Sequence, residues 1–203
     1  MTTLLLIRHA LCDHVGREIA GRKANVHLNA VGLAQAERLA EQLDGIELSA
    51  VISSSLARAR ETAAPLAERR KLAVRVDERL DEIDYGDWTG QTLDALRTSE
   101  TWGRFNSLRS VTRVPSGELM LEVQARGVSA IETIRQEFPD GTCAVVSHGD
   151  VIRGLVAHFA GIPLDLFLRI EIAPASVSVV TVSESWIGVR CVNCTLGGLA
   201  ELF

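Results

Sequence analysis

The stretch LLLIRHA, residues 4–10, decides how the fold begins. Leu4 to Ile7 are four apolar residues in a row, which is typical of a strand that enters a hydrophobic core. They lead directly into Arg8 and His9, a guanidinium that is always charged and an imidazole that titrates near neutral pH. A buried strand that delivers two such side chains at its end, only nine residues into the chain, indicates a functional site at that edge.

The composition is that of an ordinary globular protein, and it limits the choice of partners. The chain has 203 residues, of which 47% are hydrophobic and 23% are charged, so one domain of ordinary size can enclose a sizeable core. The net charge of −5 gives no electrostatic case for a nucleic-acid or anionic-membrane partner. No apolar run approaches the roughly 20 residues of a membrane span, and the N-terminus lacks the basic segment of a secretory signal.

The four cysteines are too few for a disulfide scaffold in a chain of this length. We therefore predict a reduced, cytoplasmic protein. Cys191 and Cys194, in the sequence CVNC, have the spacing of a metal-binding pair, but no second pair or histidine cluster accompanies them. In a regular strand, positions three apart point to opposite faces, so we expect both cysteines to be structural.

Strand-like and helical patterns alternate along the chain. Short apolar runs predict strands, and apolar positions three to four apart predict helices. Asn29 is suited to cap the first helix and Ser116 the third long one. The predicted strands are residues 4–7, 50–55, 72–76, 142–147, 167–173, 176–182 and 186–192, and the predicted helices are 29–43, 56–69, 115–138 and 149–161, with weaker helical segments across 92–109.

Strands that alternate with helices require crossover connections and predict a largely parallel sheet covered on both faces. We therefore expect an α/β fold, a three-layer α/β/α sandwich formed as a single domain by residues 1–203. The C-terminal strands should add an antiparallel or hairpin element, and an edge strand from this tail could support a homodimer. The least regular segment, residues 84–117, is expected to be a cap or insertion over the active site.

Charged and titratable side chains collect where three of the predicted strands end. Arg8 and His9 follow the first strand, Arg58 lies one helical turn beyond the second, and His148 follows the fourth. Ligands of open α/β sheets bind beyond the carboxyl ends of the strands. A lone arginine or histidine at such a place is usually a surface or structural residue, but the convergence of four from separate segments indicates a site.

This set of side chains suits a phosphate dianion. Guanidinium groups bind phosphate oxygens in bidentate fashion, and a helix that begins at Gly149 presents free N–H groups. The chain has no G-K-[ST] phosphate loop, no G-x-G-x-x-G and no H-E-x-x-H or H-x-H motif. We therefore expect no metal and no other cofactor. A neutral imidazole can attack phosphorus to form a phosphohistidine, and a nearby carboxylic acid would protonate the leaving group.

At these residues the sequence resembles the histidine phosphatase superfamily, in its phosphoglycerate-mutase-like branch. Any one of the shared motifs would be weak, but six in family order, over most of residues 4–154, are specific. The family's RHG appears as RHA (8–10), LTxxGxxQA as LNAVGLAQA (28–36), SSxLxRAxxTA as SSSLARARETA (53–63), LxExxxGxWxG as LDEIDYGDWTG (80–90), GE after a proline as PSGE (115–118), and VSHG as VVSHG (145–149).

The resemblance implies that His9 is the nucleophile and that Arg8, Arg58 and His148 form the phosphate pocket. It also implies that Glu82 is the proton donor and later the base that activates water. Gly149 and Gly21 complete the expected phosphate site.

Other acids lie near Glu82, and we expect them in a solvated loop: Asp77, Glu78, Asp81, Asp84 and Asp87. Glu118 is either an acid of the first helical turn or part of the pocket wall.

The chain departs from the family pattern beside the expected nucleophile. Ala10 replaces the usual glycine, which tightens the backbone there. Val15 stands where the family often has an asparagine, which removes one polar contact to phosphate. His14 is either a substitute for that contact or an exposed loop residue, and the role of Asp13 stays open.

The function implied is a metal-independent phosphatase that hydrolyses a small phosphorylated metabolite through a phosphohistidine. The alternatives are a phosphoglycerate mutase that needs a bisphosphorylated primer, and an inactive module that binds a phosphorylated ligand. Similar mutases are generally longer, whereas the short region between Gly90 and Pro115 seals the site poorly against water, and this favours hydrolysis. The presence of both His9 and Glu82 argues against an inactive module. Sugar phosphates, phosphoglycerates, an α-ribazole-type phosphate and phosphoserine all remain open as substrates.

Overall fold

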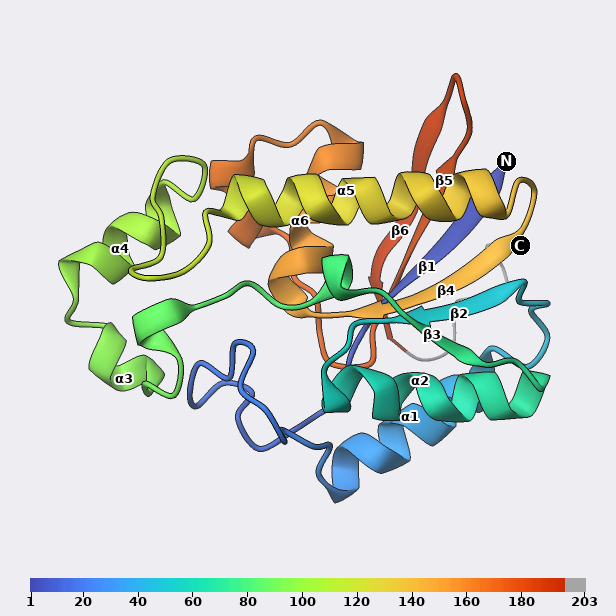
Figure 1. Ribbon diagram of the computed structural model, residues 1–203, viewed down its shortest axis with the longest axis horizontal. Coiled ribbons are helices and arrows are strands. Elements are labelled where there is room, and N and C mark those ends of the chain that lie inside the picture. Colours follow the sequence, from blue (N-terminus) through green and yellow to red (C-terminus); the bar gives the residue numbers. More distant parts are fainter. Residues whose placement is uncertain (196–203) are drawn as a thin grey trace.

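The molecule is built on a six-stranded sheet in the order β3-β2-β4-β1-β5-β6 (Figure 1). The computed structural model describes residues 1–195. The strands are β1 (Thr2–Arg8), β2 (Ala50–Ser53), β3 (Val74–Val76), β4 (Thr142–Ser147), β5 (Val177–Val182) and β6 (Ile187–Cys194). The first four run parallel, whereas β5 and β6 form an antiparallel hairpin whose first strand pairs with β1. The predicted sheet, mostly parallel with a C-terminal hairpin, is confirmed.

Helices cover both faces of this sheet, so the predicted three-layer α/β/α sandwich is also confirmed. In Figure 1, α1 (Ala30–Gln42) and α2 (Ala57–Arg70) lie below the sheet, and α5 (Met120–Glu137) and α6 (Gly149–Ala160) lie above it. The short helices α3 (Leu93–Leu96) and α4 (Glu100–Ser107) lie beyond one end of the sheet. No helix within residues 1–195 combines the length and the apolar character needed to cross a membrane.

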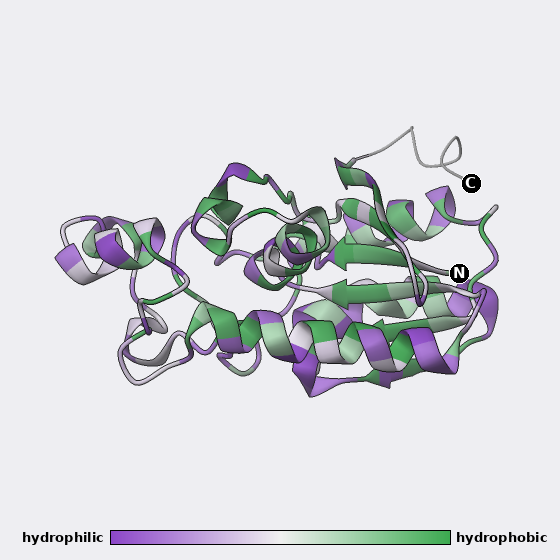
Figure 2. Cartoon of the chain, turned by 90° about the horizontal axis from the view of Figure 1, so that it is seen from above, coloured by the Kyte–Doolittle hydropathy of each residue, from purple (hydrophilic) through white to green (hydrophobic). Residues whose placement is uncertain are grey.

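The first strand is buried on both of its faces. Leu4 and Leu6 pack into the cluster that holds α5 and α6, whereas Leu5 and Ile7 pack into the cluster that holds α1 and α2. Each of the four is at most 1% exposed, and burial of such a side chain contributes about 1.5–3 kcal/mol. In Figure 2 the strands are coloured mostly green, as apolar residues, whereas the helices carry purple, polar residues among the green ones.

The first helix begins as the sequence predicts. Asn29 is its N-cap, and its side-chain oxygen accepts a hydrogen bond from the N–H of Gly32 at 2.9 Å. Gly32 lies against the loop that follows the first strand, because a Cβ built on it would be 2.0 Å from the carbonyl oxygen of Leu11. The helix can therefore approach the backbone beside His9 only with a glycine at this position.

The start of α5 differs from the prediction. Ser116 does not cap the helix, because its φ of +57° places it in a turn and the helix begins four residues later, at Met120. The acid of the first turn, Glu122, accepts the N–H of Leu119 at 2.9 Å and takes over the capping role. Glu118 therefore lies outside the helix, and its interpretation as a first-turn acid is wrong.

The strand predicted at residues 167–173 is also wrong. A 3-10 helix, η3 (Leu164–Arg169), begins after Pro163 and covers the first three residues of this stretch, and residues 170–173 are irregular. Phe167 is fully buried, and the carbonyl oxygen of Ile170 accepts a hydrogen bond from Nε of Arg153 at 2.9 Å. The Arg153 side chain thus satisfies the Ile170 carbonyl group, which would otherwise need a hydrogen bond from a neighbouring strand.

The two cysteines of the CVNC sequence do not point to opposite faces. Cys191 is opposite Val179 and Cys194 is opposite Val177, so three residues of β6 match two of β5 in a β-bulge. Asn193 absorbs the extra residue with a φ of +59°. Both cysteines consequently pack against the core cluster that contains Val177 and Val179, and both are free thiols.

Replacement of Gly32 by alanine is expected to lower the free energy of unfolding by at least about 2 kcal/mol, because the added methyl group collides with the Leu11 carbonyl. Gly103→Ala in α4 is the matched control, since a Cβ there meets nothing within 4 Å. That variant should be more stable than the natural chain by about 0.5–1 kcal/mol, the ordinary gain from alanine in a helix. Urea denaturation of both variants checks this, and equal stability of Gly32→Ala and the natural chain would contradict it.

Candidate active site

The ends of β1 and β4 bring the two predicted histidines together. Arg8 is opposite Ser147 in the parallel pair, and the N–H of His9 donates to the carbonyl oxygen of Ser147 at 2.8 Å. The rings of His9 and His148 are consequently neighbours, with centroids 5.2 Å apart. Parallel strands end at the same edge, so this follows directly from the topology.

His9 is held in one tautomer. Its Nδ1 lies 2.7 Å from the carbonyl oxygen of Ala10, and because a carbonyl only accepts, Nδ1 carries the hydrogen. The lone pair is therefore on Nε2, which accepts a hydrogen bond from Nε of Arg58 at 3.3 Å. Burial and the charges of Arg58 and Arg8 lower the pKa of His9 well below its usual value, so the ring is neutral and keeps an electron pair for attack.

Two guanidiniums lie beside this ring, each tied to the backbone. Arg58, in α2, is 2% exposed and donates through Nη2 to the carbonyl oxygen of Gly21 at 2.8 Å. Arg8 donates through Nη1 to the carbonyl oxygen of Ile172 at 2.6 Å. Gly149 begins α6 close to Arg8, since a Cβ there would lie 3.3 Å from Nε of Arg8. Gly21 thus positions Arg58, and Gly149 lets the helix terminus approach Arg8.

His148 is fully buried and is oriented by a chain of hydrogen bonds. Ser54 donates its hydroxyl hydrogen to Asp81 at 2.8 Å, so Nε2 of His148, 2.7 Å from the same hydroxyl, is the donor to it. Asp81 is buried and also accepts from the N–H and the hydroxyl of Ser55, both at 2.7 Å. The expectation of a solvated loop is therefore wrong for Asp81, which holds the second histidine through Ser54.

Polar atoms without partners concentrate at these residues. Within residues 1–195, six buried side-chain nitrogen or oxygen atoms have no hydrogen-bond partner, and three of them are Nε of Arg8, Nη1 of Arg58 and Nδ1 of His148. An unmatched buried polar group costs about 1–3 kcal/mol. The two guanidinium nitrogens are hydrogen-bond donors, and donors without partners gathered at one place indicate a site for an anion.

The cavity in front of these groups has a volume of about 390 Å³. Its wall contains six of the seven predicted site residues, and the seventh, His148, is buried next to His9. The six are Arg8, His9, Gly21, Arg58, Glu82 and Gly149. The structure therefore brings all the predicted side chains to one place.

Glu82 contributes a carboxyl group with an unusual pKa. Burial and the negative charge of Asp150 raise the pKa of Glu82 to about 7, against the opposing effect of Arg58. Its Oε1 accepts the N–H of Ile83 at 3.0 Å. A carboxyl group that holds its proton near neutral pH is suited to act as a general acid.

Asp150 is a functional residue that the sequence reasoning missed, although it directly follows Gly149. It lines the cavity and accepts hydrogen bonds from the Tyr85 hydroxyl, Arg109 and Arg153 at 2.7, 2.7 and 2.8 Å. Burial would raise the pKa of Asp150, but Arg109 and Arg153 hold it below the usual range. The resulting carboxylate is the charge that raises the pKa of Glu82.

The loop after His9 contributes side chains to the cavity wall. His14 and Val15 both line the cavity, and Nε2 of His14 lies 3.1 Å from the carboxylate of Glu18. Asp13 is exposed and accepts a hydrogen bond from the Asn29 side chain at 2.8 Å.

Glu118 does not line the cavity, so its interpretation as part of the pocket wall is wrong as well. Within residues 1–195, no group of three or more His, Cys, Asp or Glu side chains is arranged to hold a metal ion.

Comparisons with known proteins agree with this geometry. Residues 4–195 match the model of the family described as "Histidine phosphatase superfamily (branch 1)". The Proteus mirabilis protein named "Probable phosphoglycerate mutase GpmB" is 29% identical over 206 residues, which cover all of this chain and 95% of that protein. The "Glucosyl-3-phosphoglycerate phosphatase" of Mycobacterium tuberculosis is 33% identical over 171 residues, which cover 79% of this chain and 76% of that protein.

A solved structure shows the same arrangement of elements. "Bacillus stearothermophilus YhfR" superimposes with a TM-score of 0.88 at 31% sequence identity, over 94% of this chain and 96% of that one. The fold and the family match together support one conclusion. This chain belongs to the histidine phosphatase superfamily, branch 1.

Proposed function

We propose that the protein is a metal-independent phosphatase that hydrolyses a small phosphorylated metabolite through a phosphohistidine on His9. The observation that carries this proposal is the set of three partnerless buried atoms on Arg8, Arg58 and His148 beside a neutral imidazole. A phosphate dianion would accept hydrogen bonds from both guanidinium nitrogens, and its charge would favour a proton on Nδ1 of His148, which would then donate to it as well. Relatives named as phosphatases support the same reaction class.

The proposed reaction has two steps. Nε2 of His9 attacks phosphorus, the bond from phosphorus to the alcohol oxygen breaks, and Glu82 gives its proton to that oxygen. In the second step Glu82 takes a proton from water, which attacks phosphorus, breaks the bond to Nε2 and releases inorganic phosphate. Arg8, Arg58 and His148 stabilise the charge on the phosphoryl oxygens throughout, and the residues need no metal for this role.

The alcohol part of the substrate would occupy the outer half of the cavity. Residues 84–117 serve as the proposed cap of a single domain and contribute Tyr85, Leu93, Trp102 and Arg109 to the wall. We place the enzyme in the cytoplasm, which fits the four free thiols. A phosphoglycerate mutase activity is the second candidate, because one relative carries that name.

A screen of phosphate release over a panel of sugar phosphates, phosphoglycerates, nucleotide-like phosphates and phosphoserine tests the reaction class. We expect release from at least one metabolite at a rate that a chelator leaves unchanged, and no interconversion of 2- and 3-phosphoglycerate in the presence of the bisphosphorylated primer. Loss of activity with the chelator would contradict metal independence. Interconversion faster than phosphate release would assign the chain to the mutases.

Replacement of His9 by alanine should lower kcat by at least about 10⁴-fold, because the attacking nitrogen is removed. Inorganic phosphate should still bind, since both arginines remain, and calorimetry can measure this. His158→Ala, at an exposed position on α6, is the control and should keep full activity. Appreciable turnover by the His9 variant would mean that another group is the nucleophile.

Replacement of Glu82 by glutamine should affect poor leaving groups most, because these depend on protonation. We expect a loss of about 10²–10⁴-fold in kcat/KM for alkyl phosphates and a much smaller loss for an aryl phosphate. The pKa of about 7 also predicts that kcat/KM of the natural enzyme falls as the pH rises through 7, since Glu82 loses its proton. The variant should lack this limb of the pH profile, and an equal loss for both ester classes would remove Glu82 from the role.

A further inference from the structure

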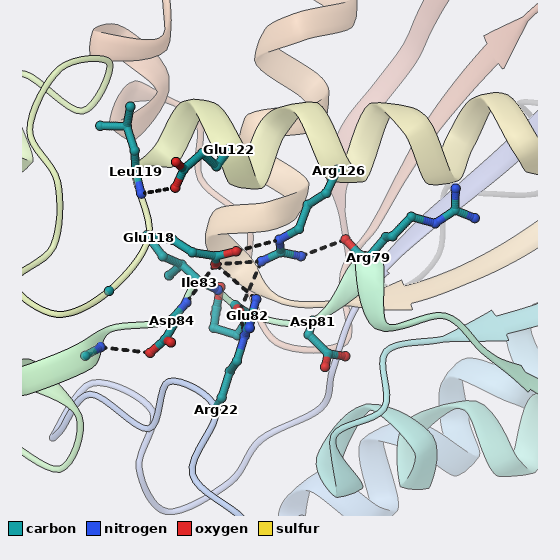
Figure 3. A network of polar contacts seen from close by, with 12 residues as sticks. Arg22, Arg79, Asp81, Glu82, Ile83, Asp84, Glu118, Leu119, Glu122 and Arg126 are labelled. Carbon is teal, nitrogen blue, oxygen red and sulfur yellow. Dashed lines mark hydrogen bonds and ion pairs between the residues drawn. The ribbon is translucent and has the colours of Figure 1, made fainter.

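The PSGE motif, residues 115–118, has no part in the reaction proposed above, yet its glutamate is heavily engaged. Glu118 is 20% exposed at its side chain, and its carboxylate accepts four hydrogen bonds (Figure 3). The donors are Nε and Nη2 of Arg126, both at 3.1 Å, Nη2 of Arg22 at 3.0 Å, and the N–H of Asp84 at 2.9 Å. One carboxylate therefore joins three separate segments of the chain.

The two guanidiniums held by Glu118 also reach the backbone of Glu82. Nε of Arg22 donates to the Glu82 carbonyl oxygen at 2.8 Å, and Nη2 of Arg126 donates to it at 3.2 Å. Arg126 further donates through Nη1 to the carbonyl oxygen of Arg79 at 2.6 Å. The segment that carries the acid is thus fixed at residues 79, 82 and 84.

The backbone of the motif lies directly against that segment. The N–H of Glu118 donates to the carbonyl oxygen of Asp84 at 3.0 Å. A Cβ on Gly117 would lie 2.3 Å from that same oxygen, and a Cβ on Gly86 would lie 2.1 Å from the carbonyl oxygen of Pro115. Only glycines permit this approach, which fixes Glu118 relative to the Glu82 segment.

The position of the two guanidiniums matters for the charge of Glu82. A guanidinium that paired with the Glu82 carboxylate would stabilise its ionised form. In the structure both guanidiniums are instead held on the carbonyl oxygen of Glu82, and Glu118 supplies the negative charge that they require. The Glu82 carboxyl keeps a single hydrogen bond within residues 1–195, from the N–H of Ile83.

We propose that Glu118 is a positioning residue for Glu82. By holding Arg22 and Arg126 on the Glu82 backbone, its carboxylate fixes the acid in place and keeps both cations away from the group that donates the proton. This inference rests on the proposed role of Glu82 as the general acid.

The test is Glu118→Gln, which keeps the shape of the side chain but removes its charge. We expect kcat for an alkyl phosphate to fall about tenfold or more, a part of what proton transfer contributes. The loss of kcat for p-nitrophenyl phosphate should stay below about threefold, and inhibition by inorganic phosphate should be unchanged, because Arg8 and Arg58 are not touched. The basic limb of the kcat/KM profile should shift to lower pH as the freed guanidiniums reach the carboxylate.

Two further variants separate positioning from general stability. Glu122→Gln is the matched control, because Glu122 is exposed, pairs with Arg113 and has no contact with the Glu82 segment, and it should keep the natural activity and pH profile. In the double variant Glu82→Gln/Glu118→Gln, the second change should cost nothing, since its effect passes through Glu82. An equal loss for both esters, or a further loss in the double variant, would overturn the proposal.

An error in the proposed role of Glu82 would give a different result from an error in the proposed role of Glu118, so the experiments distinguish the two. If Glu82→Gln itself shows no dependence on the leaving group, the role of Glu82 is wrong whatever Glu118 does. Should Glu118→Gln not fold, Arg22→Gln replaces it, because Arg22 is 37% exposed at its side chain and supplies one of the two donors to the Glu82 carbonyl. That variant should show the same selective loss for alkyl phosphates, and an unselective loss would overturn the proposal.

Discussion

The parallel pairing of β1 with β4 sets the position of everything in the cavity. Arg8 lies opposite Ser147 in this pair, and the residue that follows each strand end is a histidine. Because β1 alternates leucines and isoleucine between two core clusters, a slip of one residue would move each apolar side chain to the wrong face. The packed core therefore fixes the register of the two strands, and with it the distance between the two imidazole rings.

The charged residues are arranged so that the two arginines of the site are not neutralised by carboxylates and can bind an anion. Within the part of the chain described here, neither Arg8 nor Arg58 forms a salt bridge: Arg8 donates to one carbonyl oxygen, and Arg58 donates to one carbonyl oxygen and to His9. The nearby carboxylates have other partners, since Asp81 binds serines and Asp150 binds Tyr85, Arg109 and Arg153. The same arrangement leaves Glu82 as the carboxyl whose pKa is raised to about 7.

The sequence was sufficient for the layers of the fold and for the residues at the strand ends, because both follow from periodicity and from parallel topology. Glu82 needed the family resemblance, since several acids crowd its stretch and spacing does not distinguish them. The supporting residues Ser54, Asp81 and Asp150 were missed because their roles depend on contacts between distant segments. The strand expected at 167–173 failed for a similar reason, as a distant arginine satisfies its backbone.

The β-bulge near Asn193 has a consequence for the outer border of the molecule. It interrupts the regular spacing of β6, the last strand of the sheet, and irregular border strands are poor templates for the addition of foreign strands. At the opposite border β3 has only three residues, which gives little length for such pairing. Both margins of the sheet thus resist aggregation through added strands, although the strands between them are almost wholly buried.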